Sequence, residues 1–194
     1  MKRTVCTYAV GKEKFRVMAL SMMLSVREQA SACVDRYVVF TDELSWRKCP
    51  EWIELVPLEC AVSQDRDANW AIKPLLLSHP AVADDLLLYI DSDTTIYKNV
   101  IDQCFKWIEA HSLLVYMDFL QPEENWGRVN LYTIYRQAGF QVRNLKINAG
   151  IIGRKPDEIG RTMQRLYGEL FSAGQLKPYF SDEMYRKNDE PYLG

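Results

Sequence analysis

Strand-like and helix-like segments alternate along this chain, and this alternation restricts its fold more than any other feature. Short runs rich in β-branched and aromatic residues are typical of strands, and the segments between them carry apolar residues at helical spacing. Strands that alternate with helices form parallel pairs joined by crossover connections. The sequence therefore predicts an α/β domain in which helices flank a parallel or mostly parallel sheet.

The expected elements can be placed along the whole chain. Strands are predicted at residues 4–10, 35–42, 52–59, 86–90, 112–119 and 145–153, and helices at 14–31, 71–82, 100–110 and 157–174. Pro50 and Pro57 place the third strand near an edge of the sheet, and Pro74 marks the start of the second helix. Residues 120–145 are polar and aromatic without a clear period, as is typical of a binding loop.

One domain over residues 1–194 is expected, because no repeat, low-complexity tract or linker interrupts the pattern. The ending, DEPYLG, is compatible with further domains C-terminal to it. A net charge of −2 gives no basic field for nucleic acid. The five cysteines form no C-x-x-C pair, and neither an export signal nor a long apolar stretch is visible. These features predict a cytoplasmic protein without a membrane span.

Two carboxylates follow the most apolar strand. Leu86 to Ile90 has the continuous apolar character of a strand covered on both faces, and Asp91 and Asp93 come directly after it. Ligands of open α/β sheets bind at the carboxyl ends of the strands. Two such carboxylates can hold Mg²⁺ or Mn²⁺, which would bridge a diphosphate. The alternative is that Asp91 ends the strand and that Asp93 or Thr94 caps the next helix.

The stretch LLLYIDSDTTIYKNV, followed some fifty residues later by KINAGIIGRKPD, resembles the GT-A glycosyltransferases, and most closely their glycogenin-like and galactosyltransferase-like branch. The resemblance runs from Thr4 to about Tyr185. It implies the GT-A fold and sugar transfer from a nucleotide-diphosphate sugar, with a UDP-sugar favoured, to a hydroxyl of a glycan acceptor. It assigns Mn²⁺ or Mg²⁺ to Asp91 and Asp93, and it places Ser92 near the ribose.

The resemblance also implies donor-binding residues before the DSD motif. Thr7 and Tyr8 would meet the nucleotide at the end of the first strand, although Tyr8 also suits a core position. Arg66 and Lys73 match basic residues that contact the donor sugar and its phosphates, and cationic groups are the natural partners of a diphosphate. Arg66 could equally be a solvated surface charge.

A second donor-binding segment is implied after the aromatic loop. Asn148, Ala149 and Gly150 match the family's Asn-(Ala/Ser)-Gly strand, in which the amide reads sugar hydroxyls and the small residues let the donor approach the backbone. Gly150 is also compatible with a β-bulge that has no role in binding.

The implied catalytic residues lie near the end of the chain. Asp182 resembles the carboxylate beside the anomeric carbon, and Glu183 stands where the family usually has Gln. If the enzyme inverts, one of them is the general base, and if it retains, the same carboxylate stabilises an oxocarbenium-like centre. The family's late His and Lys-Pro-Trp are missing from the sequence. The metal would then depend on Asp91, Asp93, the diphosphate and water.

The acceptor is expected at the aromatic loop. Trp126, Tyr132 and Tyr135 offer flat apolar faces against which sugars pack, and Asp118, at the end of its strand, could bind an acceptor hydroxyl. Asp118 could also serve as a strand-end cap.

Two other functions remain open from the sequence. YIDSDTT satisfies the D-x-D-x-T pattern of haloacid-dehalogenase-like phosphatases, in which the first Asp is a nucleophile, but there the motif normally opens the domain. A non-catalytic domain that binds sugar nucleotides or glycans is the third possibility, which the missing late His would favour.

Overall fold

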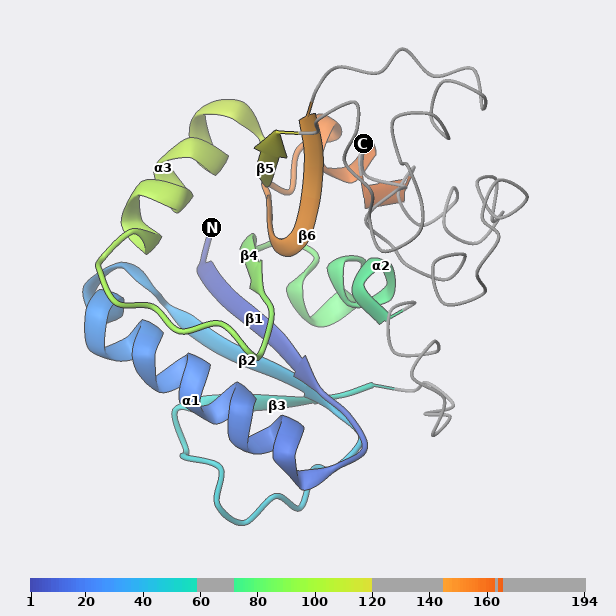
Figure 1. The fold of residues 1–194 in the computed structure, drawn as a ribbon. Coiled ribbons are helices and arrows are strands. Elements are labelled where there is room, and N and C mark those ends of the chain that lie inside the picture. Colours follow the sequence, from blue (N-terminus) through green and yellow to red (C-terminus); the bar gives the residue numbers. More distant parts are fainter. Residues whose placement is uncertain (59–71, 120–144, 163, 166–194) are drawn as a thin grey trace.

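A six-stranded sheet organises the part of the chain that the computed structural model describes, which comprises residues 1–58, 72–119, 145–162 and 164–165 (Figure 1). Its strands are β1 (Arg3–Ala9), β2 (Arg36–Thr41), β3 (Ile53–Pro57), β4 (Leu86–Ile90), β5 (Leu113–Phe119) and β6 (Leu145–Arg154). Their order is β3-β2-β1-β4-β6-β5. The neighbours from β3 to β4 pair in parallel, whereas β6 is antiparallel to both β4 and β5. The predicted α/β class with a mostly parallel sheet is confirmed.

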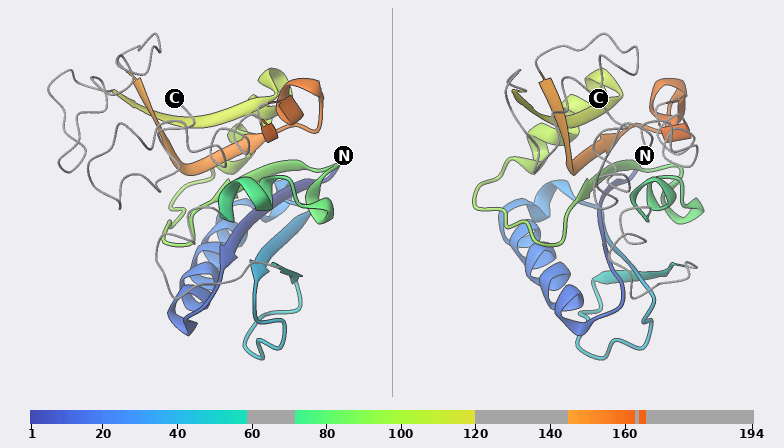
Figure 2. Two further views of the ribbon diagram at one scale, coloured as in Figure 1. Left: turned by 90° about the vertical axis from the view of Figure 1, so that its right-hand side faces the viewer. Right: turned by 45° about the vertical axis from the view of Figure 1, so that its right-hand side comes forward.

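Helices cover both faces of this sheet. They are α1 (Glu13–Ala30), α2 (Ile72–Leu77) and α3 (Ile101–His111), and short 3₁₀ turns cover Ser31–Cys33 and Pro80–Val82. Alternate residues of β1 and β4 pack with α1 and α3 in one apolar core. The remaining residues of these strands face α2, which lies on the other side of the sheet (Figures 1 and 2). β4 is therefore buried along its whole length.

Most predicted boundaries agree with the structure to within one or two residues, and β3 is an edge strand, as its prolines indicated. The second helix is the exception, because it was expected over residues 71–82 and ends at Leu77. Pro80 has no N–H to donate and begins a 3₁₀ turn instead. Pro74 is the third residue of α2 rather than its start. The aromatic loop and most of the 157–174 helix lie outside the described residues.

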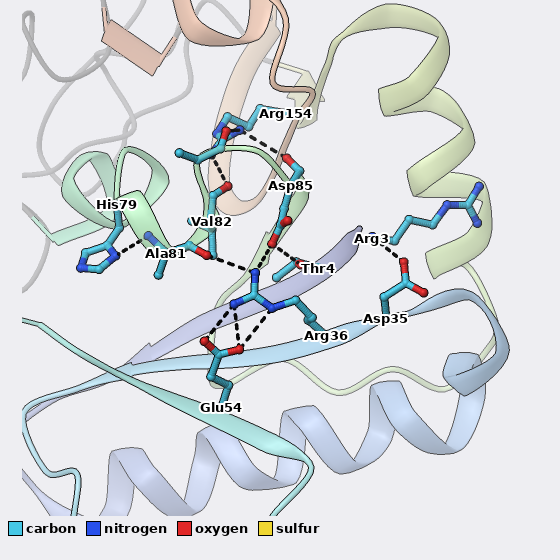
Figure 3. Close-up of polar contacts among 11 residues, drawn as sticks. Arg3, Thr4, Asp35, Arg36, Glu54, His79, Ala81, Val82, Asp85 and Arg154 are labelled. Carbon is cyan, nitrogen blue, oxygen red and sulfur yellow. Dashed lines mark hydrogen bonds and ion pairs between the residues drawn. The ribbon is translucent and has the colours of Figure 1, made fainter. Parts of the chain in front are cut away.

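Arg154, the last residue of β6, is buried and holds several backbone carbonyls. Its side chain is 1% exposed, and its guanidinium donates to the carbonyl oxygens of Leu77, Val82, Ala83 and Asp85 at 2.9 to 3.4 Å. Figure 3 shows this side chain above the turn that precedes β4. Burial lowers the pKa of the guanidinium, whereas the nearby Cys6 and Asp85 raise it. Arg154 thus fixes the end of α2 relative to β4 and β6.

A second polar cluster joins the amino-terminal ends of the strands. The Asp85 carboxylate accepts a hydrogen bond from the Thr4 hydroxyl at 2.7 Å and pairs with the Arg36 guanidinium, which also binds Glu54 at 2.7 Å (Figure 3). These contacts tie β1, β2, β3 and β4 together. They lie at the edge of the sheet opposite the DSD motif.

The described cysteines are one buried and three half-buried thiols. Cys6, Cys33, Cys49 and Cys104 are free thiols, and Cys60 lies outside the described residues. Complete burial raises the pKa of the Cys6 thiol, which therefore stays protonated near neutral pH. Among the described segments, no helix combines the length and the apolar character that a membrane span requires.

We predict that Arg154→Met lowers the free energy of unfolding by about 2–4 kcal/mol, because several buried carbonyl oxygens lose a charged donor. Urea denaturation followed by circular dichroism measures this loss. Arg47→Met is the control, since Arg47 is exposed, and its effect should stay within about 0.5 kcal/mol. Equal stability of the two variants would show that the Arg154 contacts are energetically unimportant.

Candidate functional site

The DSD motif lies in a cavity at the carboxyl edge of the sheet. The cavity has a volume of about 230 Å³ and is formed by the ends of β1 and β4, the start of α1, and α2. The residues that line it are Tyr8, Val10, Lys14, Phe15, Met18, Lys73, Asp91, Ser92 and Asp93. The structure thus brings together the predicted donor-binding residues Asp91, Ser92 and Asp93, which follow β4, with Lys73 from α2 and Tyr8 from β1. This edge is where open α/β sheets bind ligands.

Strand register decides which side chains reach the cavity. β1 and β4 are parallel, with Cys6 opposite Tyr89, and alternation places Tyr89 and Asp91 on the face that carries Tyr8. The rings of Tyr8 and Tyr89 stack with their centroids 6.3 Å apart. Thr7 points to the opposite face and is fully buried, and its hydroxyl makes no hydrogen bond to any described residue. Of the two residues predicted from β1, Tyr8 therefore lines the cavity.

Two donors from the described residues hold Asp91. The Lys73 ammonium lies 3.4 Å from each of its carboxylate oxygens, and the Tyr89 hydroxyl donates a hydrogen bond to Oδ1. Lys73 also lies over the Tyr89 ring, 5.8 Å from its centroid. The Lys73 side chain is only 8% exposed, whereas that of Asp91 is 31% exposed. Burial of the Lys73 side chain strengthens this ion pair, because water screens a buried charge less than an exposed one.

The predicted Asn-Ala-Gly segment lies beside the motif. The backbone N–H of Asp91 donates to the carbonyl oxygen of Gly150 at 2.8 Å, which extends the pairing of β4 with β6 by one residue. The register of β6 against β5 shifts here, because Val115 is opposite Ile152 whereas Tyr116 is opposite Asn148. Residues 149–151 form a bulge, and Figure 2 shows β6 sharply bent. A bulge at Gly150 is therefore confirmed, and the segment lies beside the DSD motif.

The carboxylates fit a divalent metal that another ligand helps to hold. Asp91 and Asp93 both line the cavity and supply the hard oxygen ligands that Mn²⁺ and Mg²⁺ prefer. Within the described segments, no group of three or more His, Cys, Asp or Glu residues could hold a metal by itself. His79, which accepts a hydrogen bond from the Ala81 N–H, and His111 at the end of α3 are not among the lining residues. A metal here would need oxygen atoms from a ligand such as a diphosphate.

Several predicted residues lie outside the described part of the chain. They are Arg66, Trp126, Tyr132, Tyr135, Asp182 and Glu183. For Asp118, Asn148 and Ala149 the structure gives the strand positions, in β5 and β6. Their part in binding or catalysis stays a prediction.

Sequence reasoning missed part of the cavity wall. Lys14, Phe15 and Met18 come from the first turns of α1. Tyr89, which does not line the cavity, was read only as strand core, whereas its hydroxyl holds Asp91. The signal for Tyr89 was its position two residues before Asp91, which places both side chains on one face. For Phe15 and Met18 the signal was their spacing of three at the start of the helix that follows β1.

Comparison with known proteins gives structural matches only. No protein-family model matches the chain, and no curated protein matches it in sequence. The structure is similar to that of the galactosyltransferase LgtC, solved in complex with donor and acceptor sugar analogs, with a TM-score of 0.65 and 13% identity over 98% of this chain and 69% of LgtC. It is also similar to the bifunctional glycosyltransferase WbbM, in its apo form, with a TM-score of 0.59 and 12% identity over 89% of this chain and 35% of WbbM. At such identities the likeness shows the fold, and the predicted GT-A fold is confirmed.

Proposed function

We propose that this protein is a metal-dependent glycosyltransferase that moves a sugar from a nucleotide-diphosphate donor, with a UDP-sugar favoured, to a hydroxyl of a glycan acceptor. The observation that carries the proposal is the cavity in which Asp91, Asp93 and Lys73 meet at the carboxyl end of β4. Two carboxylates and an ammonium together suit a metal-bound diphosphate. The similarity in fold to LgtC and WbbM supports the same reading.

Different residues of the cavity would bind different parts of the donor. Asp91 and Asp93 would hold Mn²⁺ or Mg²⁺, which when bound supplies positive charge to the departing diphosphate. Lys73 would stabilise negative charge on the same phosphates. Ser92 lies between the two carboxylates and would meet the ribose, and the Tyr8 ring would lie against the nucleotide.

The sugar end of the donor would lie toward β6. Gly150 is adjacent to Asp91, and the bulge there gives a ligand access to the backbone. Asn148 and Ala149 belong to this bent segment, so we propose that they contact the donor sugar. Thr7 is buried on the opposite face of the sheet, so we do not propose it as a donor contact, and we retain Arg66 as a further contact to the donor.

The chemical step would be displacement at the anomeric carbon. Asp182 or Glu183 would act as the general base of an inverting enzyme or would stabilise the cationic sugar of a retaining one. Trp126 and Tyr132 would pack against the acceptor, and Asp118 would accept a hydrogen bond from one of its hydroxyls. The roles of Asp182 and Glu183 rest on the sequence resemblance, and those of the acceptor residues rest on their chemistry and position in the sequence.

We predict that Asp93→Asn reduces the release of UDP from UDP-sugars in the presence of Mn²⁺ by roughly 100-fold or more, since the metal loses a charged ligand at the departing diphosphate. The assay compares UDP-glucose, UDP-galactose and UDP-N-acetylglucosamine, each with and without a mixture of glycan acceptors. Asp84→Asn is the control, because Asp84 is exposed at the opposite end of the same strand and should keep full activity. Full activity of Asp93→Asn would remove the assigned metal role.

We predict that Tyr89→Phe weakens the binding of UDP with Mn²⁺ by roughly three- to tenfold, because Asp91 loses the hydroxyl that orients its carboxylate. Isothermal titration calorimetry measures this affinity. Tyr37→Phe is the matched control, since the buried Tyr37 hydroxyl has no hydrogen-bond partner in the described part of the chain. An equal effect of both substitutions would assign the loss to packing rather than to Asp91.

The same kinds of assay also test the two alternatives, a non-catalytic binding domain and a phosphatase. A protein that binds UDP-sugars with metal but neither hydrolyses nor transfers them is a binding domain. Hydrolysis of a simple phosphate ester that depends on Asp91 would indicate the phosphatase chemistry. The structure gives no observation that favours either, and the DSD strand comes fourth along the chain rather than first.

A further inference from the structure

The described residues that line the cavity are formally neutral together, although they include the carboxylates proposed to hold a metal. Its charged lining residues are Asp91 and Asp93, which are negative, and Lys14 and Lys73, which are positive. The two signs therefore cancel within the lining.

Lys73 is placed to compete with a metal for Asp91. Its ammonium contacts both oxygens of the Asp91 carboxylate at 3.4 Å. A divalent cation that binds these oxygens meets a like charge at close range, which costs binding free energy. Asp93 makes no ion pair within the described segments, so it is the carboxylate more open to a metal.

Arg154 holds the end of the short helix that carries Lys73. Arg154 donates to the carbonyl oxygen of Leu77, the last residue of α2, and to the carbonyl oxygen of Val82 in the turn that follows. Lys73 lies in the first turns of the same short helix. A change of partner by Lys73 can therefore take place through its four side-chain torsions, without movement of α2.

We propose that Lys73 exchanges partners when the donor binds, leaving Asp91 for the diphosphate as the metal takes its place on the carboxylate. This inference rests on the proposed function and adds that the metal and the nucleotide bind tightly only when both are present. Metal or nucleotide alone binds weakly, because metal alone meets the Lys73 ammonium at the Asp91 carboxylate and nucleotide alone brings its phosphates beside that carboxylate. Together they bind tightly, because the metal satisfies Asp91 and the diphosphate satisfies Lys73. The site thus selects the metal–nucleotide complex.

The test measures Mn²⁺ binding directly, by the loss of the electron paramagnetic resonance signal of free Mn²⁺, with and without UDP. Values with UDP are corrected for the Mn²⁺–UDP complex that forms in solution. For the wild-type protein we expect Mn²⁺ to bind roughly 100-fold more tightly with UDP than alone, at the upper end of usual coupling between sites.

Lys73→Met is the decisive variant, because methionine keeps the length of the side chain and removes its charge. We expect Mn²⁺ alone to bind roughly tenfold more tightly to this variant than to wild type, whereas Mn²⁺ with UDP binds more weakly. Lys73→Arg keeps the charge and should leave the affinity for Mn²⁺ alone near the wild-type value. Lys14→Met is the matched control, since Lys14 lines the same cavity and lies over the Phe15 ring rather than on Asp91, and its effect should be smaller.

The outcomes separate this inference from the proposed function. Wild-type protein that binds no UDP with Mn²⁺ would overturn both. Wild-type protein that binds UDP with Mn²⁺, together with a Lys73→Met variant whose affinity for Mn²⁺ alone is unchanged or weaker, would overturn the exchange only. If Lys73→Met does not fold, the wild-type protein still tests the exchange of partners by Lys73. Equal Mn²⁺ affinity of the wild-type protein with and without UDP would contradict that exchange.

Discussion

The burial of β4 on both faces is the constraint on which the rest of this structure depends. Every residue from Leu86 to Ile90 is inaccessible or nearly so, with α1 and α3 on one side and α2 on the other. Charged residues can appear only after such a strand ends, because an unpaired buried charge is too costly. Asp91 and Asp93 are therefore forced to the carboxyl edge, where the parallel neighbour β1 ends as well. The cavity is a consequence of how the sheet is covered.

Contacts at the two ends of β4 have different roles. At the amino-terminal end, Arg36, Asp85 and Arg154 satisfy one another and the surrounding carbonyl groups, which holds α2 and the strands in place (Figure 3). At the carboxyl end, the Lys73–Asp91 pair is partly open to solvent. A closed network suits structural support, whereas an ion pair at the wall of a cavity can exchange one partner for a ligand. This difference separates the scaffold of the molecule from its candidate site.

Much of this arrangement could be predicted from the sequence, because strands and helices leave periodic patterns. The apolar run before Asp91 indicated a doubly covered strand, and the structure places it in the centre of the sheet. Lys73 was assigned to the site by resemblance, and it lines the cavity. Arg154 could not be recognised as buried, since arginine is ordinarily exposed and its partners are backbone carbonyls from distant segments. The bulge in β6 was only one of two readings of Gly150, because strand register depends on pairing that a single segment does not encode.

The measurement that tests the central claim most directly is a crystal structure of the wild-type protein with Mn²⁺ and UDP, in which anomalous scattering locates the metal. The account predicts a manganese peak at the Asp91 and Asp93 carboxylates, with the diphosphate bound to it and the Lys73 ammonium turned toward the phosphates. Manganese or nucleotide bound away from this cavity, with the Lys73–Asp91 pair intact, would contradict it.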